Sequence, residues 1–141
     1  MDRLTNAEGM VLLKNDGQLL PLAKGTKIAL FGRSQLNYYK SGTGSGGAVN
    51  TEYVTGILDA LQADDTYQLN QRLLDTYQAW VEEHPFDVGN GWATEPWSQL
   101  EMPLSMDLVQ EAAVTSDVAV IIIGRLAGED RDTQQSPAAI Y

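Results

Sequence analysis

The chain has 141 residues, enough for one domain with a hydrophobic core. Its 19 acidic and 9 basic side chains give a formal net charge of −10, which argues against binding to nucleic acid or to an anionic membrane. It has no cysteine and one histidine, so we expect no disulfide, no metal site and no bound cofactor. Without an apolar leader or a run near the ~20 apolar residues of a membrane span, a cytoplasmic location is expected.

The first half of the chain alternates helical and extended patterns. Apolar spacing predicts a helix over Asn6 to Leu13, which the turn residues Asn15-Asp16-Gly17 end. The apolar run Lys27 to Gly32 predicts a short buried strand. The glycine-rich loop Gly42 to Gly47 follows, and Thr51 to Leu61 then has helical spacing. These segments form a strand, loop and helix unit.

The second half repeats this alternation. An amphipathic helix is predicted over Gln68 to Glu83, although Thr66 to Leu69 could instead give a third strand. Phe86 to Pro103 shows no period and predicts a long irregular excursion, with Trp92 and Trp97 available either for sugar stacking or for packing on the sheet. A further helix is predicted over Leu104 to Thr115, capped by Ser105, with four residues facing inward: Leu108, Val109, Ala112 and Ala113.

The last predicted element points to a site. Val118 to Ile123 is an apolar run rich in β-branched residues, typical of a strand buried on both faces of a parallel sheet. In open α/β sheets, ligands bind beyond the carboxyl ends of the strands. The loop that follows carries Glu129 between Gly128 and the pair Asp130-Arg131, so we expect Glu129 at the functional rim.

The alternation indicates an α/β fold with a mostly parallel sheet. Two or three strands are few for a stable α/β domain, so we expect residues 1–141 to be part of a domain whose later strands lie elsewhere. The strand over Val118 to Ile123 would then lack a neighbour, and we expect the chain to bury that edge by self-association, strand exchange or partial collapse.

Three functions are compatible with these residues. Glu129 could be a catalytic carboxylate, although an acid beside Arg125 or Arg131 is more simply a solvated loop residue. The spacing Gly42-x-Gly44-x-x-Gly47 could bind a nucleotide or a phosphate, but it begins about ten residues after the strand and no phosphate-loop lysine accompanies it. The third alternative is a noncatalytic interaction domain that uses an exposed sheet edge.

Several segments in order resemble the second domain of family 3 glycoside hydrolases of the β-glucosidase type. The resemblance covers nearly the whole chain, and the segments that carry it are Glu8 to Gly17, Leu19 to Leu22, Lys27 to Gly32, Thr43 to Gly46, Asp117 to Arg125 and Gly128 to Arg131.

The resemblance implies a three-layer α/β sandwich that works beside a catalytic barrel domain absent from this chain. It implies a retaining hydrolase of O-glycosidic bonds, acting on a glucoside or another small glycoside, with the nucleophilic aspartate on the barrel. Glu129 would be the general acid/base, and Ser45 would lie near the sugar. Because one carboxylate is half of such a mechanism, we expect the chain alone to be inactive.

Overall fold

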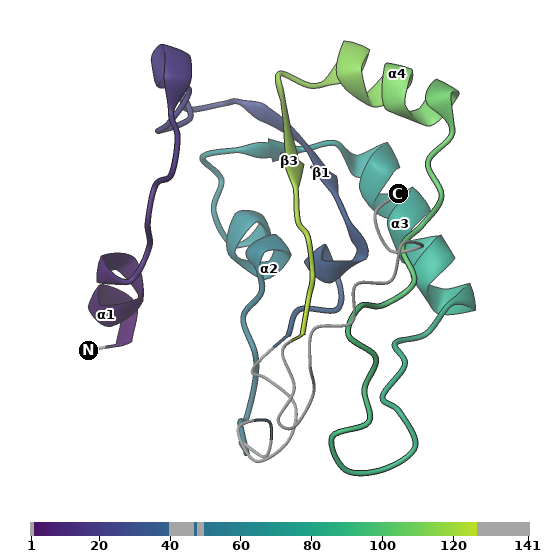
Figure 1. Cartoon of the computed structure of the whole chain (residues 1–141). Coiled ribbons are helices and arrows are strands. Elements are labelled where there is room, and N and C mark those ends of the chain that lie inside the picture. The colour runs from purple at the N-terminus through teal and green to yellow at the C-terminus, as the bar shows by residue number, and fades with distance from the viewer. Residues whose placement is uncertain (1, 40–46, 48–49, 127–141) are drawn as a thin grey trace.

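The computed structural model describes residues 2–39, 47 and 50–126, which include a small parallel sheet (Figure 1). Strand β1 (Lys27–Phe31) lies between β2 (Gln68–Leu69) and β3 (Val118–Ile121), in the order β2-β1-β3. Both pairs are parallel, with Ile28 opposite Leu69 on one side and Phe31 opposite Ile121 on the other. The predicted first strand and the third strand at its alternative position are both confirmed.

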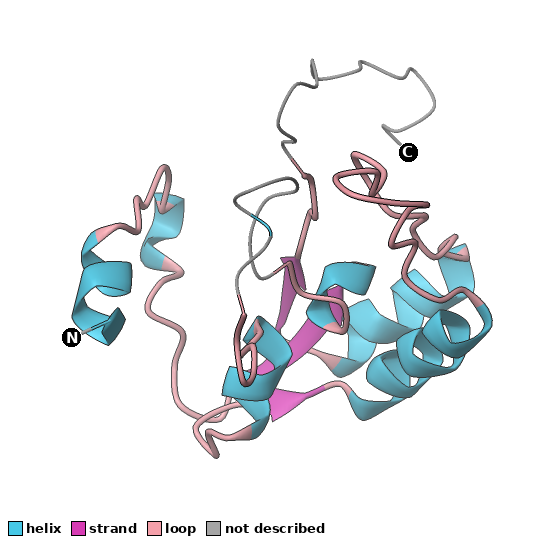
Figure 2. Ribbon diagram, turned by 90° about the horizontal axis from the view of Figure 1, so that it is seen from below, coloured by secondary structure: helices cyan, strands magenta, loops and turns pink. Residues whose placement is uncertain are grey.

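Helices cover both faces of the sheet, as Figure 2 shows. Helices α3 (Gln71–Glu83) and α4 (Met106–Thr115) pack on the face that carries Ala29, whereas α2 (Ile57–Gln62) packs on the face that carries Leu30. This alternation follows from the period of two in a strand. The expected three-layer α/β sandwich with a parallel sheet is confirmed.

Side-chain caps decide where the helices begin. Helix α2 starts at Ile57 rather than at the predicted Thr51, because the Asp59 carboxylate accepts the N–H of Gly56 at 2.7 Å and fixes the first turn there. Helix α3 starts at Gln71 because Asn70 caps it, accepting the N–H of Leu73 at 3.1 Å. The two residues before Asn70 form β2 instead of extending the predicted helix.

Helix α4 begins after Ser105, as expected, and the Ser105 hydroxyl accepts the N–H of Leu108 at 3.2 Å. Ala112 is buried, while Leu108 and Val109 are partly buried. Ala113 is exposed, contrary to the prediction, because it faces an open groove between α4 and the sheet, whereas Ala112 packs with Ala29 in the core.

The N-terminal prediction was wrong in its bounds. Helix α1 spans Asp2–Glu8, and the apolar residues after Gly9 are non-helical and exposed, with Leu13 92% accessible. Glycine has a low helix propensity, and side chains that bury no apolar surface do not stabilise a longer helix. The expected turn is present as the short 3₁₀ helix η1 (Asp16–Gln18), and the Asn15 side chain bonds both backbone groups of Leu20.

Strand β3 also differs from the prediction. It is an edge strand, paired only with β1 among the described residues, and its side chains alternate between partly buried and exposed. Ile121 and Ile123 are 70% and 71% exposed, so the expected burial on both faces is absent within the described part of the chain. Burial depends on what packs against the outer face, which an apolar run cannot reveal.

The segment between α3 and α4 is irregular, as predicted, and Figure 1 shows it at the same end of the sheet as the carboxyl ends of β1 and β3. Within the ranges that the structure describes, no helix has both the length and the apolar character needed to cross a membrane.

Candidate functional site

The two predicted site residues come after two neighbouring strands in the sequence. Ser45 lies on the connection after β1, and Glu129 lies on the segment after β3; both fall outside the described residues. Strands β1 and β3 are parallel and adjacent, so their carboxyl ends meet at one edge of the sheet. The described residues around that edge therefore form the base from which both segments start.

The backbones that follow β1 and β3 approach each other closely. Gly32 has a φ of 98°, and a Cβ on it would overlap the carbonyl oxygen of Ile122. A Cβ on Gly124 would overlap the hydroxyl of Ser34 and would come within 3.0 Å of the Tyr39 ring. Only glycine permits this approach, so these two residues fix the spacing of the two exits.

A buried arginine organises this edge. Arg33 begins the short 3₁₀ helix η2 (Arg33–Gln35) directly after β1 and is 1% exposed. Its guanidinium donates to the carbonyl of Leu100 at 2.8 Å, to the carbonyl of His84 at 2.9 Å and to the side-chain oxygen of Asn37 at 3.0 Å. The guanidinium carbon also lies 5.3 Å from the centre of the Trp80 ring. One side chain thus joins the end of α3 to the irregular excursion.

Glu101 and Tyr39 lie close to Arg33 and interact with its charge. The carboxylate of Glu101 accepts the backbone N–H of Arg33 at 2.9 Å. Burial lowers the pKa of Arg33, and the nearby Glu101 and Tyr39 oppose that effect; a guanidinium stays protonated in proteins. Burial likewise raises the pKa of Tyr39 above its usual value, opposed by the positive charge of Arg33.

The irregular excursion is attached to the segment that leads toward Glu129. The carbonyl of Trp97 accepts the N–H of Leu126 at 2.9 Å, and the Arg125 guanidinium carbon lies 5.0 Å from the centre of the Trp97 ring. Trp97 is partly buried, whereas Trp92 in the same excursion is 69% exposed. The two uses expected of these indoles were sugar stacking and packing, and the Trp97 ring packs against Arg125.

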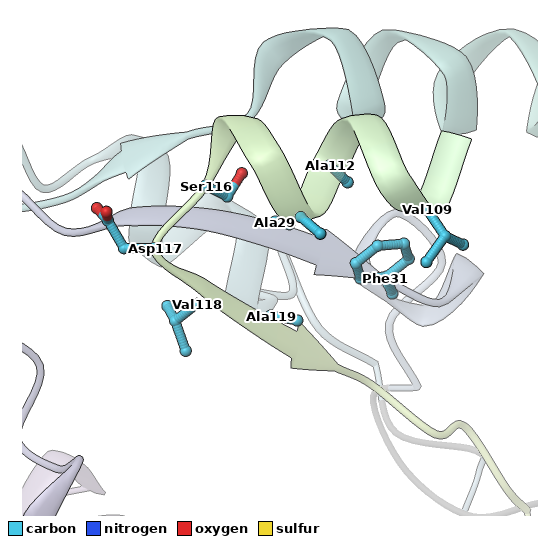
Figure 3. A pocket seen from close by; sticks show the side chains of 9 residues that line it. Ala29, Phe31, Val109, Ala112, Ser116, Asp117, Val118 and Ala119 are labelled. Atoms are coloured by element: carbon cyan, nitrogen blue, oxygen red, sulfur yellow. The ribbon is translucent and has the colours of Figure 1, made fainter. Parts of the chain in front are cut away.

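A hollow lies between α4 and the face shared by β1 and β3 (Figure 3). It is a groove of about 270 Å³ with mostly apolar walls: Ala29, Phe31, Val109, Ala112, Ala113, Ser116, Asp117, Val118 and Ala119. Its acidic residue is already used, since the Asp117 carboxylate accepts the N–H of Lys27 at 2.7 Å. Apart from Asp117, no residue that lines the groove has an ionisable side chain.

Sequence reasoning missed Arg33, Gln99 and Glu101, whose partners lie between 4 and 68 residues away in the chain. The available signal was a charged side chain placed directly after the glycine that ends a buried strand. Among the described residues, no group of three or more histidine, aspartate or glutamate side chains is arranged to hold a metal ion.

Comparison with known proteins gives one consistent result. Residues 10–139 match the model of the glycosyl hydrolase family 3 C-terminal domain. A β-glucosidase of Ruminococcus albus is 56% identical over 127 residues, covering 90% of this chain and 13% of that protein. β-Glucosidase A of Butyrivibrio fibrisolvens is 36% identical over 127 residues, covering 89% of this chain and 14% of the relative.

Solved structures agree. A β-glucosidase from Paenibacillus barengoltzii superposes with a TM-score of 0.90 at 50% identity, covering 95% of this chain and 14% of that one. β-Glucosidase 3B from Thermotoga neapolitana, in complex with α-D-glucose, gives a TM-score of 0.80 at 31% identity over 94% of this chain and 18% of its own. The chain thus spans less than a fifth of the length of these relatives, and it belongs to the glycosyl hydrolase family 3 C-terminal domain family.

Proposed function

We propose that this chain is the part of a retaining β-glucosidase that supplies the general acid/base, Glu129. The observation that carries the proposal is that β3, the strand that precedes Gly128-Glu129 in the sequence, ends beside β1 at one edge of the sheet. Membership of a glycosyl hydrolase domain family, with relatives named β-glucosidases, supports the same reaction.

The proposed chemistry needs a second carboxylate. A retaining glycosidase holds two carboxyl groups about 5 to 5.5 Å apart: one attacks the anomeric carbon, and the other protonates the leaving oxygen and then activates water. We assign the second role to Glu129 and expect the nucleophile on a barrel domain beyond this chain. The acid must stay protonated near neutral pH, which desolvation by the barrel and the nucleophile's negative charge would achieve.

Ser45 is assigned to binding or positioning of the sugar. A serine acts as a nucleophile only when a base activates it, and the histidine of this chain, His84, directs its Nδ1 to the carbonyl of Trp80 at 2.9 Å at the end of α3. The Ser45 segment begins from the same edge as the Glu129 segment, which suits a residue that contacts the same sugar.

By itself, the chain is proposed to be inactive and to self-associate. Half of the catalytic pair is missing, and Glu129 would stay hydrated without the barrel. The exposed Ile121 ends strand β3 and the exposed Ile123 follows it; the outer edge of β3 pairs with no described residue, and a second copy of this chain can cover this surface.

The experiment that tests the function uses the full-length enzyme with Glu129→Ala. The kcat/KM for a glucoside with a poor leaving group, such as phenyl glucoside, should fall far more than the kcat/KM for 2,4-dinitrophenyl glucoside, since only the former needs its leaving oxygen protonated. Azide should restore part of the turnover of the activated substrate and form a glycosyl azide. Equal loss with both substrates would remove Glu129 from the acid/base role. Glycosidase activity of the chain alone, lost in Glu129→Gln, would contradict the need for the barrel.

A further inference from the structure

The irregular excursion contains a closed loop, residues 87–99, whose end is tied to the exit of β3. Its stem is shut by the Gln99 side chain, which bonds both backbone groups of Asp87. Just before Glu101, the Leu100 carbonyl accepts from the buried guanidinium of Arg33. The loop is therefore fixed to the body of the domain at its second limb.

That second limb holds the segment that leads to the proposed acid. The Trp97 carbonyl accepts the N–H of Leu126, which is itself buried, and the Trp97 ring covers the guanidinium of Arg125. Glu129 follows Leu126 by three residues, so its Cα lies within about 10 Å of that hydrogen bond even in an extended chain. Whatever sets the direction of residues 125 and 126 also limits where the Glu129 carboxyl can be.

We propose that Trp97 is a positioning residue for the general acid: its ring and carbonyl hold Arg125 and Leu126 so that Glu129 reaches the leaving oxygen. This inference rests on the proposed function. A displacement of about 1 Å at a reacting group can cost about 100-fold in rate, so a contact at the base of the acid's segment has leverage on catalysis. Trp97 touches neither sugar nor nucleophile in this role.

The test compares variants of the full-length enzyme on phenyl and 2,4-dinitrophenyl glucosides, which share an aromatic leaving group and differ in their need for an acid. Trp97→Leu removes the aromatic face and should lower kcat/KM, which reports the step that expels the leaving group, by about 10- to 100-fold for the phenyl glucoside and by less than about threefold for the dinitrophenyl glucoside. Trp97→Phe keeps an aromatic face and should restore most of the selective loss. Trp92→Leu, an exposed indole in the same loop, should leave the ratio of the two rates unchanged.

A second route removes the cation. Arg125→Met should reproduce the selective loss, and the double variant with Trp97→Leu should lose no more than the worse single variant, because both changes break the same contact between the indole ring and the guanidinium. This arm also covers the case in which Trp97→Leu fails to fold.

Glu129→Gln separates the two ideas. If Glu129→Gln shows no selectivity for the phenyl glucoside, the proposed function fails. If Glu129→Gln is selective while Trp97→Leu and Arg125→Met slow both substrates equally or neither, only the positioning role is overturned. Selective losses in all three support both.

Discussion

The side-chain amide of Gln99 bonds both backbone groups of Asp87: its oxygen accepts the N–H at 2.8 Å, and its nitrogen donates to the carbonyl at 2.9 Å. Gln99 is buried, so Gln99→Leu should lower the free energy of unfolding by about 1 to 3 kcal/mol and speed hydrogen exchange at the Asp87 amide. Denaturant unfolding and exchange mass spectrometry measure these effects. Gln78→Leu, on the exposed face of α3, is the control. An unchanged exchange rate at Asp87 would contradict the expectation.

The contact between Gly124 and Ser34 makes a steric prediction. A methyl group at position 124 overlaps the Ser34 hydroxyl, so Gly124→Ala should destabilise the chain by about 1 to 3 kcal/mol. Ser34→Gly should relieve much of that cost in the double variant, which a double-mutant cycle in urea would detect. The idea is wrong if Gly124→Ala alone unfolds at the same denaturant concentration as the unmodified chain.

The raised pKa of Tyr77 predicts that the folded chain loses stability at alkaline pH. Burial raises the pKa of Tyr77, while the Gly32 N–H, which donates to the Tyr77 hydroxyl at 3.0 Å, opposes that effect. Below the usual tyrosine pKa of about 10, the Tyr77 hydroxyl is protonated in both the folded and the unfolded chain, and its contribution to the free energy of unfolding is complete. Above it, the unfolded chain ionises first, so the free energy of unfolding falls as pH rises toward the folded pKa.

The measurement is urea denaturation between about pH 8 and pH 11, compared with Tyr77→Phe. The variant should be less stable near neutrality by about 1 to 3 kcal/mol, because the Gly32 N–H loses its acceptor. Above pH 10 the free energy of unfolding of the variant should fall less steeply than that of the unmodified chain, but it should still fall, since the pKa of Tyr39 is also raised by burial. Parallel curves for the two proteins would refute the assignment.

Ser45 is expected to contribute binding rather than covalent chemistry. In the full-length enzyme, Ser45→Ala should cost about 1 to 2 kcal/mol of transition-state stabilisation, the range for one hydrogen bond to a neutral or partly charged group. The ratio of kcat/KM between the variant and the parent enzyme gives this value. A loss of about five orders of magnitude would assign Ser45 a chemical role instead.

The uncovered side of β3 predicts concentration-dependent assembly of the isolated chain. Light scattering over a dilution series should show association, and Ile121→Lys should weaken it by placing a charge on the contact surface. Val114→Lys changes an even more exposed apolar residue, on α4, and should have little effect. A strictly monomeric chain with two-state unfolding would show that β3 needs no partner.

Local sequence patterns predicted the elements whose causes are local. The strand over Lys27 to Gly32 needs only an apolar run, and the start of α4 needs only the Ser105 hydroxyl. The start of α2 was missed because the Asp59 carboxylate, rather than apolar spacing, selects Gly56 as the first cap. The exposure of Ile121 was missed because it depends on packing neighbours.

The candidate site was predictable only through the loops expected to carry Ser45 and Glu129, and their roles stay predictions. The structure adds the edge beneath those loops. Arg33 and Leu100 are 67 residues apart, so no short pattern could join them. The same holds for the bond between Trp97 and Leu126, which depends on how the excursion meets the segment after β3.

The partners of Arg33 also set an order of assembly. One acceptor is four residues away, and the other two are 51 and 67 residues further along the chain. As the polypeptide leaves the ribosome, this guanidinium is made long before the Leu100 carbonyl, and enclosing an unpartnered charge costs several kcal/mol. The arginine therefore stays hydrated during early synthesis. The carboxyl end of β1 is therefore buried only when the excursion packs against it, even if β1 is already paired in the sheet.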